Sequence, residues 1–373
     1  MDSKSYLSYV LLSSIILLMP EVSLSTWNFS AVDLPNDVPI WRFAIWRNRA
    51  FLSIPRFSGI NGNGHRGNEA TLLEAVWPES GGNYTFGVSS SGSTIHAFPK
   101  STKNTSTVCE RLLSVTGLDV DSRGRLWLLD STETVDYCSA KIVVYDLRRN
   151  DREIARIDLE GVPKSNLRSL VVDPFVGIWG PRAYIGDPGD ETIITYSLFQ
   201  RKWWKLRLRR GLDVPRVCST EIAISRKSSL LYLTGTQSQD LFSLDLRQPR
   251  IDWVPPTDAA TERYTVKWLG TKMGSSSGMV CDQKGGLHYF LITEHASVRW
   301  DTKQDLKTAS HSILLQNEDV PCVTDYRLDM QRNVWGLVNL QHPFARSSSS
   351  NFDKHWNAKY RTVRIYKYNS FGP

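Results

Sequence analysis

Six polar side chains stand where apolar, strand-like segments of the sequence end, and together they could bind a small charged ligand. They are Arg56, Asp130, Asp187, Thr236, Glu294 and Asn339. Because a carboxylate pairs with an ammonium group and an aromatic side chain stacks on an aromatic ring, Tyr184 and Phe344 are candidate walls of the same site. These residue types indicate a pocket for a ligand with a cation and an aromatic ring. The alternative for each Asp or Asn is that it ends its strand by accepting hydrogen bonds from turn amides.

Standard catalytic motifs do not add to this set. The sequence shows no GxSxG-type nucleophile elbow, no HExxH motif and no phosphate-binding loop. The seven histidines are scattered, without the spacing of metal ligands on one element. His295, next to Glu294, is the one histidine that we consider for acid–base catalysis, and the alternative is a solvated pair in a loop. We therefore expect neither a metal nor a cofactor.

The segments that would position these residues recur along the chain. Residues 117–130 contain a strand that ends at an Asp, a polar turn with Gly124, and a second, nearly continuous apolar strand. A short strand rich in Ile, Val and Tyr follows at residues 141–147. The same order recurs with an aromatic anchor in each apolar strand: Phe51, Trp127, Tyr184, Tyr232, Tyr289 and Trp335.

The repeats predict an all-β fold, a six-bladed β-propeller, because several short strands per unit at this spacing are typical of radially repeated sheets. We interpret the anchored apolar strands as the innermost strands, whose ends would surround a central channel. A strand near residues 363–366 is expected to close the ring by pairing with the segment near Trp41. The alternative is a β-sandwich or barrel without true repeats. A single sandwich seldom needs a chain as long as these 373 residues, whereas six blades would use nearly all of them.

The N-terminus predicts export. Lys4 precedes an apolar core at residues 9–19, and small residues follow at Ser23 and Ser25, so residues 1–25 read as a signal peptide. An apolar core of this length is too short to span a membrane. Residues 26–373 would then form one exported domain. The sequons at Asn28, Asn83 and Asn104 are candidate glycosylation sites, which agrees with a secreted, extracellular protein.

Charge and cysteine content narrow the partners. The formal net charge of +7 is modest for this length, and part of it lies in the run Arg201–Arg210. In an exported protein we interpret that run as a strand with a charged outer face, and we expect no nucleic-acid partner; binding of acidic polymers stays open.

Five cysteines in an exported chain indicate disulfides with one thiol left over. Cys109 and Cys138 flank the repeat at residues 117–130 and could link its ends.

The ordered motifs resemble the yellow/major royal jelly protein family of insects. They lie at residues 51–56, 70–72, 109–115, 124–130, 142–147, 183–187, 270–276 and 334–339, and span nearly the whole chain from Trp41 to Tyr366. Two positions depart from the family pattern: Arg123 stands where a Cys is usual, and Leu340 follows Asn339 where an Arg is common. The resemblance implies a Cys109–Cys138 bond and a pocket for a small aromatic amine or catechol metabolite.

Two functions follow from this resemblance. The first is a secreted binding protein, or a protein with a non-catalytic role in pigmentation, whose channel holds the aromatic amine or catechol. The second is an isomerase that acts on dopachrome in melanin formation, as attributed to some relatives. Because the sequence offers no committed acid–base pair, we favour binding, and the enzyme remains the alternative.

Overall fold

The computed structural model describes residues 26–27, 40–56, 70–77, 95–100, 107–165, 167–177, 179–251, 263–339 and 362–369. The predicted signal peptide, the three sequon asparagines and Phe344 lie outside these residues. The described part is nearly all β-structure. Its strands form four sheets of four strands and one sheet of eight. The eight-stranded sheet consists of two antiparallel halves joined by a parallel pairing between their outermost strands.

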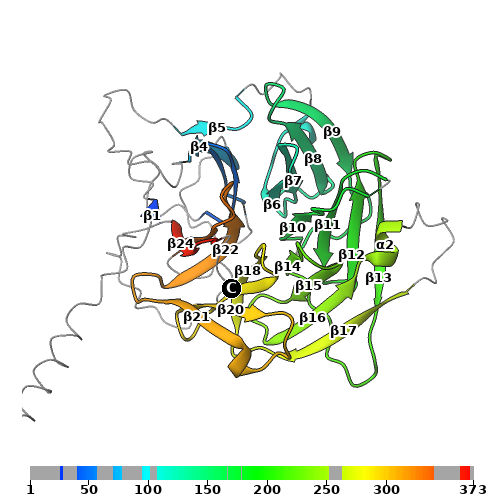
Figure 1. The fold of residues 1–373 in the computed structure, drawn as a ribbon. Coiled ribbons are helices and arrows are strands. Elements are labelled where there is room, and N and C mark those ends of the chain that lie inside the picture. Colours follow the sequence, from blue (N-terminus) through cyan, green and yellow to red (C-terminus); the bar gives the residue numbers. More distant parts are fainter. Residues whose placement is uncertain are drawn as a thin grey trace, which may run out of the picture.

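Each four-stranded unit begins with a strand near the centre of the molecule (Figure 1). These first strands are β2 (Arg42–Trp46), β6 (Val115–Val120), β10 (Leu170–Val172), β14 (Glu221–Ile224), β18 (Ser276–Cys281) and β22 (Cys322–Leu328). They contact one another in a closed ring, in which each touches the next along the chain and β22 touches β2. The ring therefore surrounds an axis onto which all units face.

Second strands pair antiparallel with the first ones. They are β3 (Arg49–Ser53), β7 (Arg125–Asp130), β11 (Arg182–Asp187), β15 (Leu230–Thr234), β19 (Gly286–Leu291) and β23 (Val334–Asn339). These are the anchored apolar strands of the sequence, and our interpretation of them as innermost was wrong. They are buried on both faces because neighbouring units pack against them, which explains their continuous apolar character.

The remaining strands complete each unit outward. Third strands are β4 (Leu72–Val76), β8 (Lys141–Asp146), β12 (Thr192–Ser197), β16 (Asp240–Asp245), β20 (Ala296–Asp301) and β24 (Thr362–Tyr366). Outermost strands are β5 (His96–Ala97), β9 (Arg152–Asp158), β13 (Lys202–Arg209), β17 (Arg263–Thr271), β21 (His311–Gln316) and β1 (Thr26–Trp27). Described helical segments are short: Val108–Glu110, Arg247–Ile251 (α2) and Thr308–Ser310.

Ring closure differs in detail from the expectation. The C-terminal strand β24 does pair with N-terminal chain, but its partner is β1, with Thr26 opposite Val363. Trp41 instead precedes β2, the first strand of the next sheet. The last sheet is thus built from both ends of the described chain, in the order β1-β24-β23-β22. Such a pairing ties the two ends of the ring together by backbone hydrogen bonds.

A repeated hydrogen bond links the first turn of a unit to its aromatic anchor. Trp127 Nε1 donates to Asp121 at 3.0 Å, the Tyr184 hydroxyl donates to Asp173 at 3.2 Å, and Trp335 Nε1 donates to Asp329 at 2.8 Å. Asp121 also accepts from the turn amides of Arg123 and Arg125. One carboxylate therefore holds both the tight turn and the buried indole.

Five of the predicted anchors are equivalent, and Tyr289 is not. Each of the five lies opposite the same position of its first strand, two residues before the residue that begins the turn, such as Asp121 in the second unit. The pairs are Phe51 with Ala44, Trp127 with Asp119, Tyr184 with Val171, Tyr232 with Ala223, and Trp335 with Arg327. In the fifth unit that position belongs to His288, which pairs with Val280 and bonds to Asp282 at 2.9 Å. We predicted Tyr289 as the anchor because it is aromatic, but its side chain faces the opposite side of the strand from that of His288.

Candidate functional site

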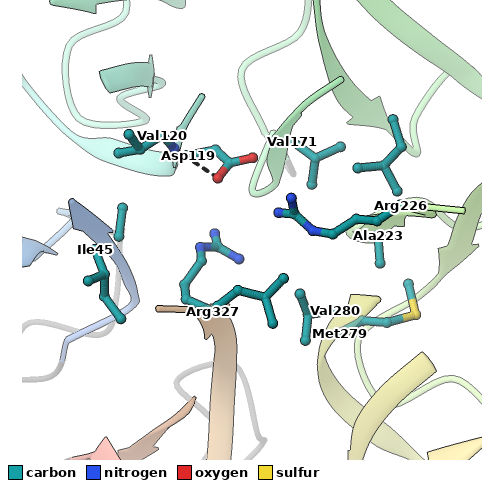
Figure 2. A pocket seen from close by; sticks show the side chains of 12 residues that line it. Ile45, Asp119, Val120, Val171, Ala223, Arg226, Met279, Val280 and Arg327 are labelled. Carbon is teal, nitrogen blue, oxygen red and sulfur yellow. Dashed lines mark hydrogen bonds between the residues drawn. The ribbon is translucent and has the colours of Figure 1, made fainter. Parts of the chain in front are cut away.

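The ring of first strands encloses a cavity of about 60 Å³ on the axis (Figure 2). Every unit contributes to its lining, because the residues that pair with the anchors all face it. The lining residues are Ala44, Ile45, Asp119, Val120, Val171, Ala223, Ile224, Arg226, Met279, Val280, Arg327 and Leu328. The cavity is thus apolar except for one carboxylate and two guanidinium groups.

Asp119, at the end of β6, is the carboxylate of this cavity. Its two oxygens accept hydrogen bonds from the backbone amides of Val120 and Val172, both at 2.8 Å. Burial raises the pKa of Asp119, and the nearby Arg327 partly offsets this effect. The carboxyl group is therefore held in a fixed direction and binds a proton more readily than an exposed Asp.

The two guanidinium groups come from the fourth and sixth units, on either side of β18, and point into the cavity toward Asp119 (Figure 2). Arg327, on β22, donates to the carbonyl of Leu118 at 2.9 Å and pairs with Asp325 at 3.0 Å. Arg226 follows β14, and no hydrogen bond or ion pair joins its guanidinium group to another described residue. Burial lowers the pKa of Arg226; Asp119 counteracts this and Arg327 adds to it.

The other end of the ring is closed by buried ion pairs. Arg42, the first residue of β2, lies 2.8 Å from Glu221 of β14 and 3.3 Å from Asp325 of β22. It also donates to the backbone carbonyl of Arg168. Burial raises the pKa of Glu221, and Arg42 opposes that shift. This cluster fills the axis with paired charges and links three sheets, so the cavity with Asp119 lies at the opposite end of the first strands.

Three of the predicted ligand residues, Asp130, Asp187 and Asn339, are buried at the ends of second strands, where each has an internal partner. Asp130 pairs with Lys141 at 2.7 Å and accepts from the amides of Leu113 and Ser114. Asp187 lies 3.1 Å from Lys205 and accepts from Thr192. These contacts match the strand-ending role that was the alternative for such residues. A ligand-binding role for Asp130 and Asp187 stays a prediction.

Neighbouring predicted residues show the same behaviour. Asn339 donates to the carbonyl of Ile40 at 2.8 Å and to the Thr324 hydroxyl at 2.6 Å. Thr236 shares a hydrogen bond of 3.1 Å with Thr220. Tyr184 lies in the core between the third and fourth units, bonded to Asp173. Their side chains therefore stabilise the fold, and among the described residues none of them lines the axial cavity.

Arg56, Glu294 and His295 complete the set. The backbone amide of Arg56 donates to the Ser114 hydroxyl at 2.9 Å just after β3. Glu294 and His295 are both exposed in the turn between β19 and β20, which is the solvated loop pair considered above. All of the predicted residues within the described chain, apart from Tyr184, lie at or beyond one end of the second strands. The axial cavity at the other end was not predicted, because Asp119, Arg226 and Arg327 are distant in sequence and follow no motif.

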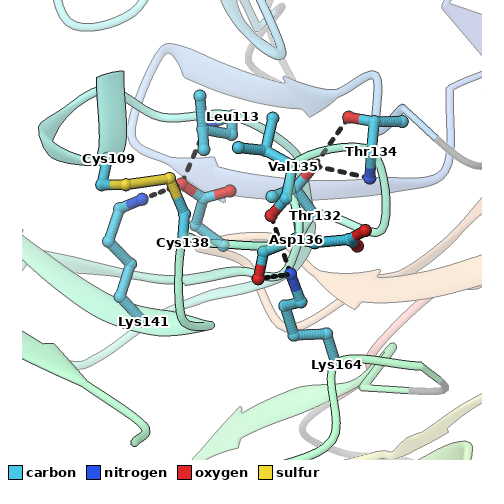
Figure 3. Close-up of a disulfide and its surroundings, with 10 residues drawn as sticks. Cys109, Leu113, Thr132, Thr134, Val135, Asp136, Cys138, Lys141 and Lys164 are labelled. Atoms are coloured by element: carbon cyan, nitrogen blue, oxygen red, sulfur yellow. Dashed lines mark hydrogen bonds and ion pairs between the residues drawn. A yellow bond between two sulfur atoms is a disulfide. The ribbon is translucent and has the colours of Figure 1, made fainter. Parts of the chain in front are cut away.

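The disulfide predicted between Cys109 and Cys138 is present (Figure 3). It joins two cysteines that are 29 positions apart in the sequence, beside the buried pair of Lys141 and Asp130. The three other cysteines, Cys218, Cys281 and Cys322, are unpaired. Burial raises the pKa of the Cys322 thiol to about 12, so this group does not react as a thiolate at neutral pH.

Two further features bear on catalysis. Our expectation of no GxSxG motif was wrong: residues 274–278 read Gly-Ser-Ser-Ser-Gly and have this spacing. Ser276, however, begins the buried strand β18 instead of a strand-to-helix turn, so it forms no nucleophile elbow. Lys272, just after β17, is 4% exposed and donates to the Thr234 hydroxyl at 2.6 Å. Burial lowers its pKa to about 7. In the described part of the chain no cluster of His, Cys, Asp and Glu could hold a metal ion, and no helix is long and apolar enough to cross a membrane.

The chain is more similar in sequence to three insect proteins than to the solved structures compared below. It is 35% identical to dopaminechrome tautomerase of Drosophila melanogaster over 107 residues, which are 26% of this chain and 23% of that protein. It is 20% identical to major royal jelly protein 7 of Apis mellifera, over 74% of this chain and 62% of that protein. For major royal jelly protein 9 of Apis mellifera the identity is 21%, over 76% and 67%. The matches thus span less than two thirds of the first two relatives.

Solved structures give weaker matches. A luciferin-regenerating enzyme is 12% identical, with a TM-score of 0.48 over 94% of this chain and 96% of that one. Virginiamycin B lyase of Staphylococcus aureus is 11% identical, with a TM-score of 0.45 over 80% and 78%. Likeness at this level decides nothing about the chain.

The family model described as major royal jelly protein matches residues 113–366, which is more than half of the chain. This chain therefore belongs to the major royal jelly protein family.

Proposed function

We propose that this chain is a secreted binding protein for a small aromatic amine or catechol metabolite, built as a six-bladed β-propeller. The closed ring of first strands and the equivalent anchors support six blades around one axis. The signal-like residues 1–25 and the sequons at Asn28, Asn83 and Asn104 support export. Membership of the family supports a ligand of the kind named in its relatives' activities.

The observation that carries the proposal is the convergence of charged groups on the axial cavity. Asp119 faces the cavity from β6, and its fixed carboxylate would pair with the ammonium group of an amine. Val171 and Met279 offer apolar surface beside it for the ligand's ring. The predicted residues at the other end, among them Asn339 and Thr236, would act indirectly by holding the second strands in place.

Calorimetry of the purified protein with dopamine and serotonin tests the proposal. Asp119→Asn keeps the size of the side chain but removes the charge, so we expect affinity for both amines to fall about tenfold or more. Asp213→Asn, on an exposed loop, is the matched control and should bind like the unchanged protein. Equal affinities of the Asp119→Asn and unchanged proteins, or no binding of either amine, would refute the axial amine site.

A second function is favoured by one specific observation. The raised pKa of Asp119 gives the cavity a carboxyl group that can accept and return a proton. A tautomerase moves a proton between two positions of its substrate, and dopaminechrome tautomerase is among the relatives. If this chain is such an enzyme, the dopaminechrome or dopachrome absorbance should change in its presence and not with Asp119→Asn. A protein that binds these compounds without altering their absorbance is a binding protein only.

A further inference from the structure

The guanidinium group of Arg226 faces the axial cavity and forms no hydrogen bond or ion pair with a described residue, so Asp119 acts on it only at longer range. The closest carboxylate in the lining, that of Asp119, is already bonded to two backbone amides. The second guanidinium group, that of Arg327, has a buried Nε with no hydrogen-bond acceptor among the described residues. Two guanidinium groups thus lie beside the carboxylate of Asp119: that of Arg327 is paired with Asp325, whereas that of Arg226 forms no ion pair with a described residue.

Such an arrangement of charges is unfavourable by itself. Burial of a charged group costs free energy unless it is paired, and two neighbouring cations add repulsion. The lowered pKa of Arg226 reflects both effects. An anion placed between Arg226 and Arg327 would satisfy the free donors of both. The carboxylate of Asp325 pairs with Arg327 and Arg42 but forms no ion pair with Arg226.

We propose that the cavity recognises the α-amino acid group of an aromatic amino acid. The ligand's carboxylate lies between Arg226 and Arg327, and its ammonium group pairs with Asp119. The ring of the amino acid lies against the apolar lining at Val171 and Met279, as in the proposed amine site. The inference rests on the proposed function and narrows its ligand class from amines to amino acids.

Four ligands that share a catechol ring test the two charges separately. Catechol carries neither charge, dopamine only the ammonium, 3,4-dihydroxyphenylpropionate only the carboxylate, and L-3,4-dihydroxyphenylalanine both. We expect the amino acid to bind about ten- to hundredfold more tightly than dopamine, because a charge-assisted hydrogen bond to its carboxylate raises the affinity by about that factor. Arg226→Gln should remove this difference and leave dopamine affinity equal or higher. Arg209→Gln, on the exposed outer strand β13, is the control and should change nothing.

The outcomes separate this inference from the proposed function. If dopamine binds through Asp119 but the amino acid binds no more tightly, the carboxylate subsite is wrong and the amine site stands. The same holds if Arg226→Gln leaves the ratio of the two affinities unchanged. If none of the four ligands binds the folded protein, both proposals fail. Should Arg226→Gln not fold, Arg226→Lys keeps the charge but loses the paired donors, and it should reduce the ratio.

Discussion

Arg42 and Glu221 form a buried ion pair across the axis of the ring, with 2.8 Å between Nη2 and Oε1. One comes from the first strand of the first sheet and the other from β14, 179 residues along the chain. Both side chains are 3% exposed, so the pair is shielded from water. Its role is to hold opposite sides of the ring together at the end away from the cavity.

Breaking this pair should destabilise the fold. In Arg42→Met, the buried carboxylates of Glu221 and Asp325 lose their shared partner, and we expect the free energy of unfolding to fall by about 3–5 kcal/mol. Adding Glu221→Gln to that variant should restore part of the loss because one uncompensated charge disappears. Urea denaturation of the three proteins measures this. A double variant less stable than Arg42→Met would contradict the role of the ion pair.

Lys272 should make stability depend on pH. Its pKa is about 7 in the folded chain and lies higher when the chain is unfolded, so the unfolded state binds more protons between these values. Stability from this residue is therefore present at high pH and lost as the pH falls toward 7. Lys272→Met should be more stable than the unchanged protein by about 1–3 kcal/mol at pH 7, and by less at about pH 9.5. Equal gains at both pH values, measured by denaturation, would show that Lys272 is not a buried amine.

The hydrogen bond between turn and anchor can be isolated with two buried tryptophans. Trp127 Nε1 donates to Asp121, whereas Trp204 Nε1 has no acceptor among the described residues. Trp127→Phe should therefore cost about 1–3 kcal/mol more than Trp204→Phe, since only the first loses a bond to a carboxylate. Thermal and urea unfolding compare the two. If Trp204→Phe lowers the free energy of unfolding by as much as Trp127→Phe, the loss comes from packing alone and not from the hydrogen bond to Asp121.

The disulfide should contribute measurably to stability. Cys138→Ser opens the loop between two cysteines that are 29 positions apart, and the chain-entropy account gives a loss of stability of about 3 kcal/mol. Cys218→Ser, at a half-buried and unpaired cysteine, is the control and should cost much less. Unfolding with and without reductant gives both values. Peptide mapping that finds Cys109 as a free thiol would overturn the pairing.

The sequence by itself determined the all-β character of the chain, the order of its repeats, the Cys109–Cys138 pair and the family. These features depend on local patterns: polar turns such as the one at Gly124, apolar strands with an aromatic, and motifs in a fixed order. Gly124 shows why such patterns are reliable. Its φ is 76°, and a Cβ at this position would overlap the ring of Trp46, so the turn requires glycine on both counts.

Tertiary structure decided which strands face the axis and which side chains meet there. The apolar second strands produced the clearest pattern in the sequence because both of their faces are buried, yet the first strands line the cavity. Asp119, Arg226 and Arg327 converge only after the ring closes between β22 and β2. Side chains alternate along a strand, so a shift of one residue, as between His288 and Tyr289, changes the face on which a residue lies. Convergence across units is therefore a property of ring closure and register, which no single segment encodes.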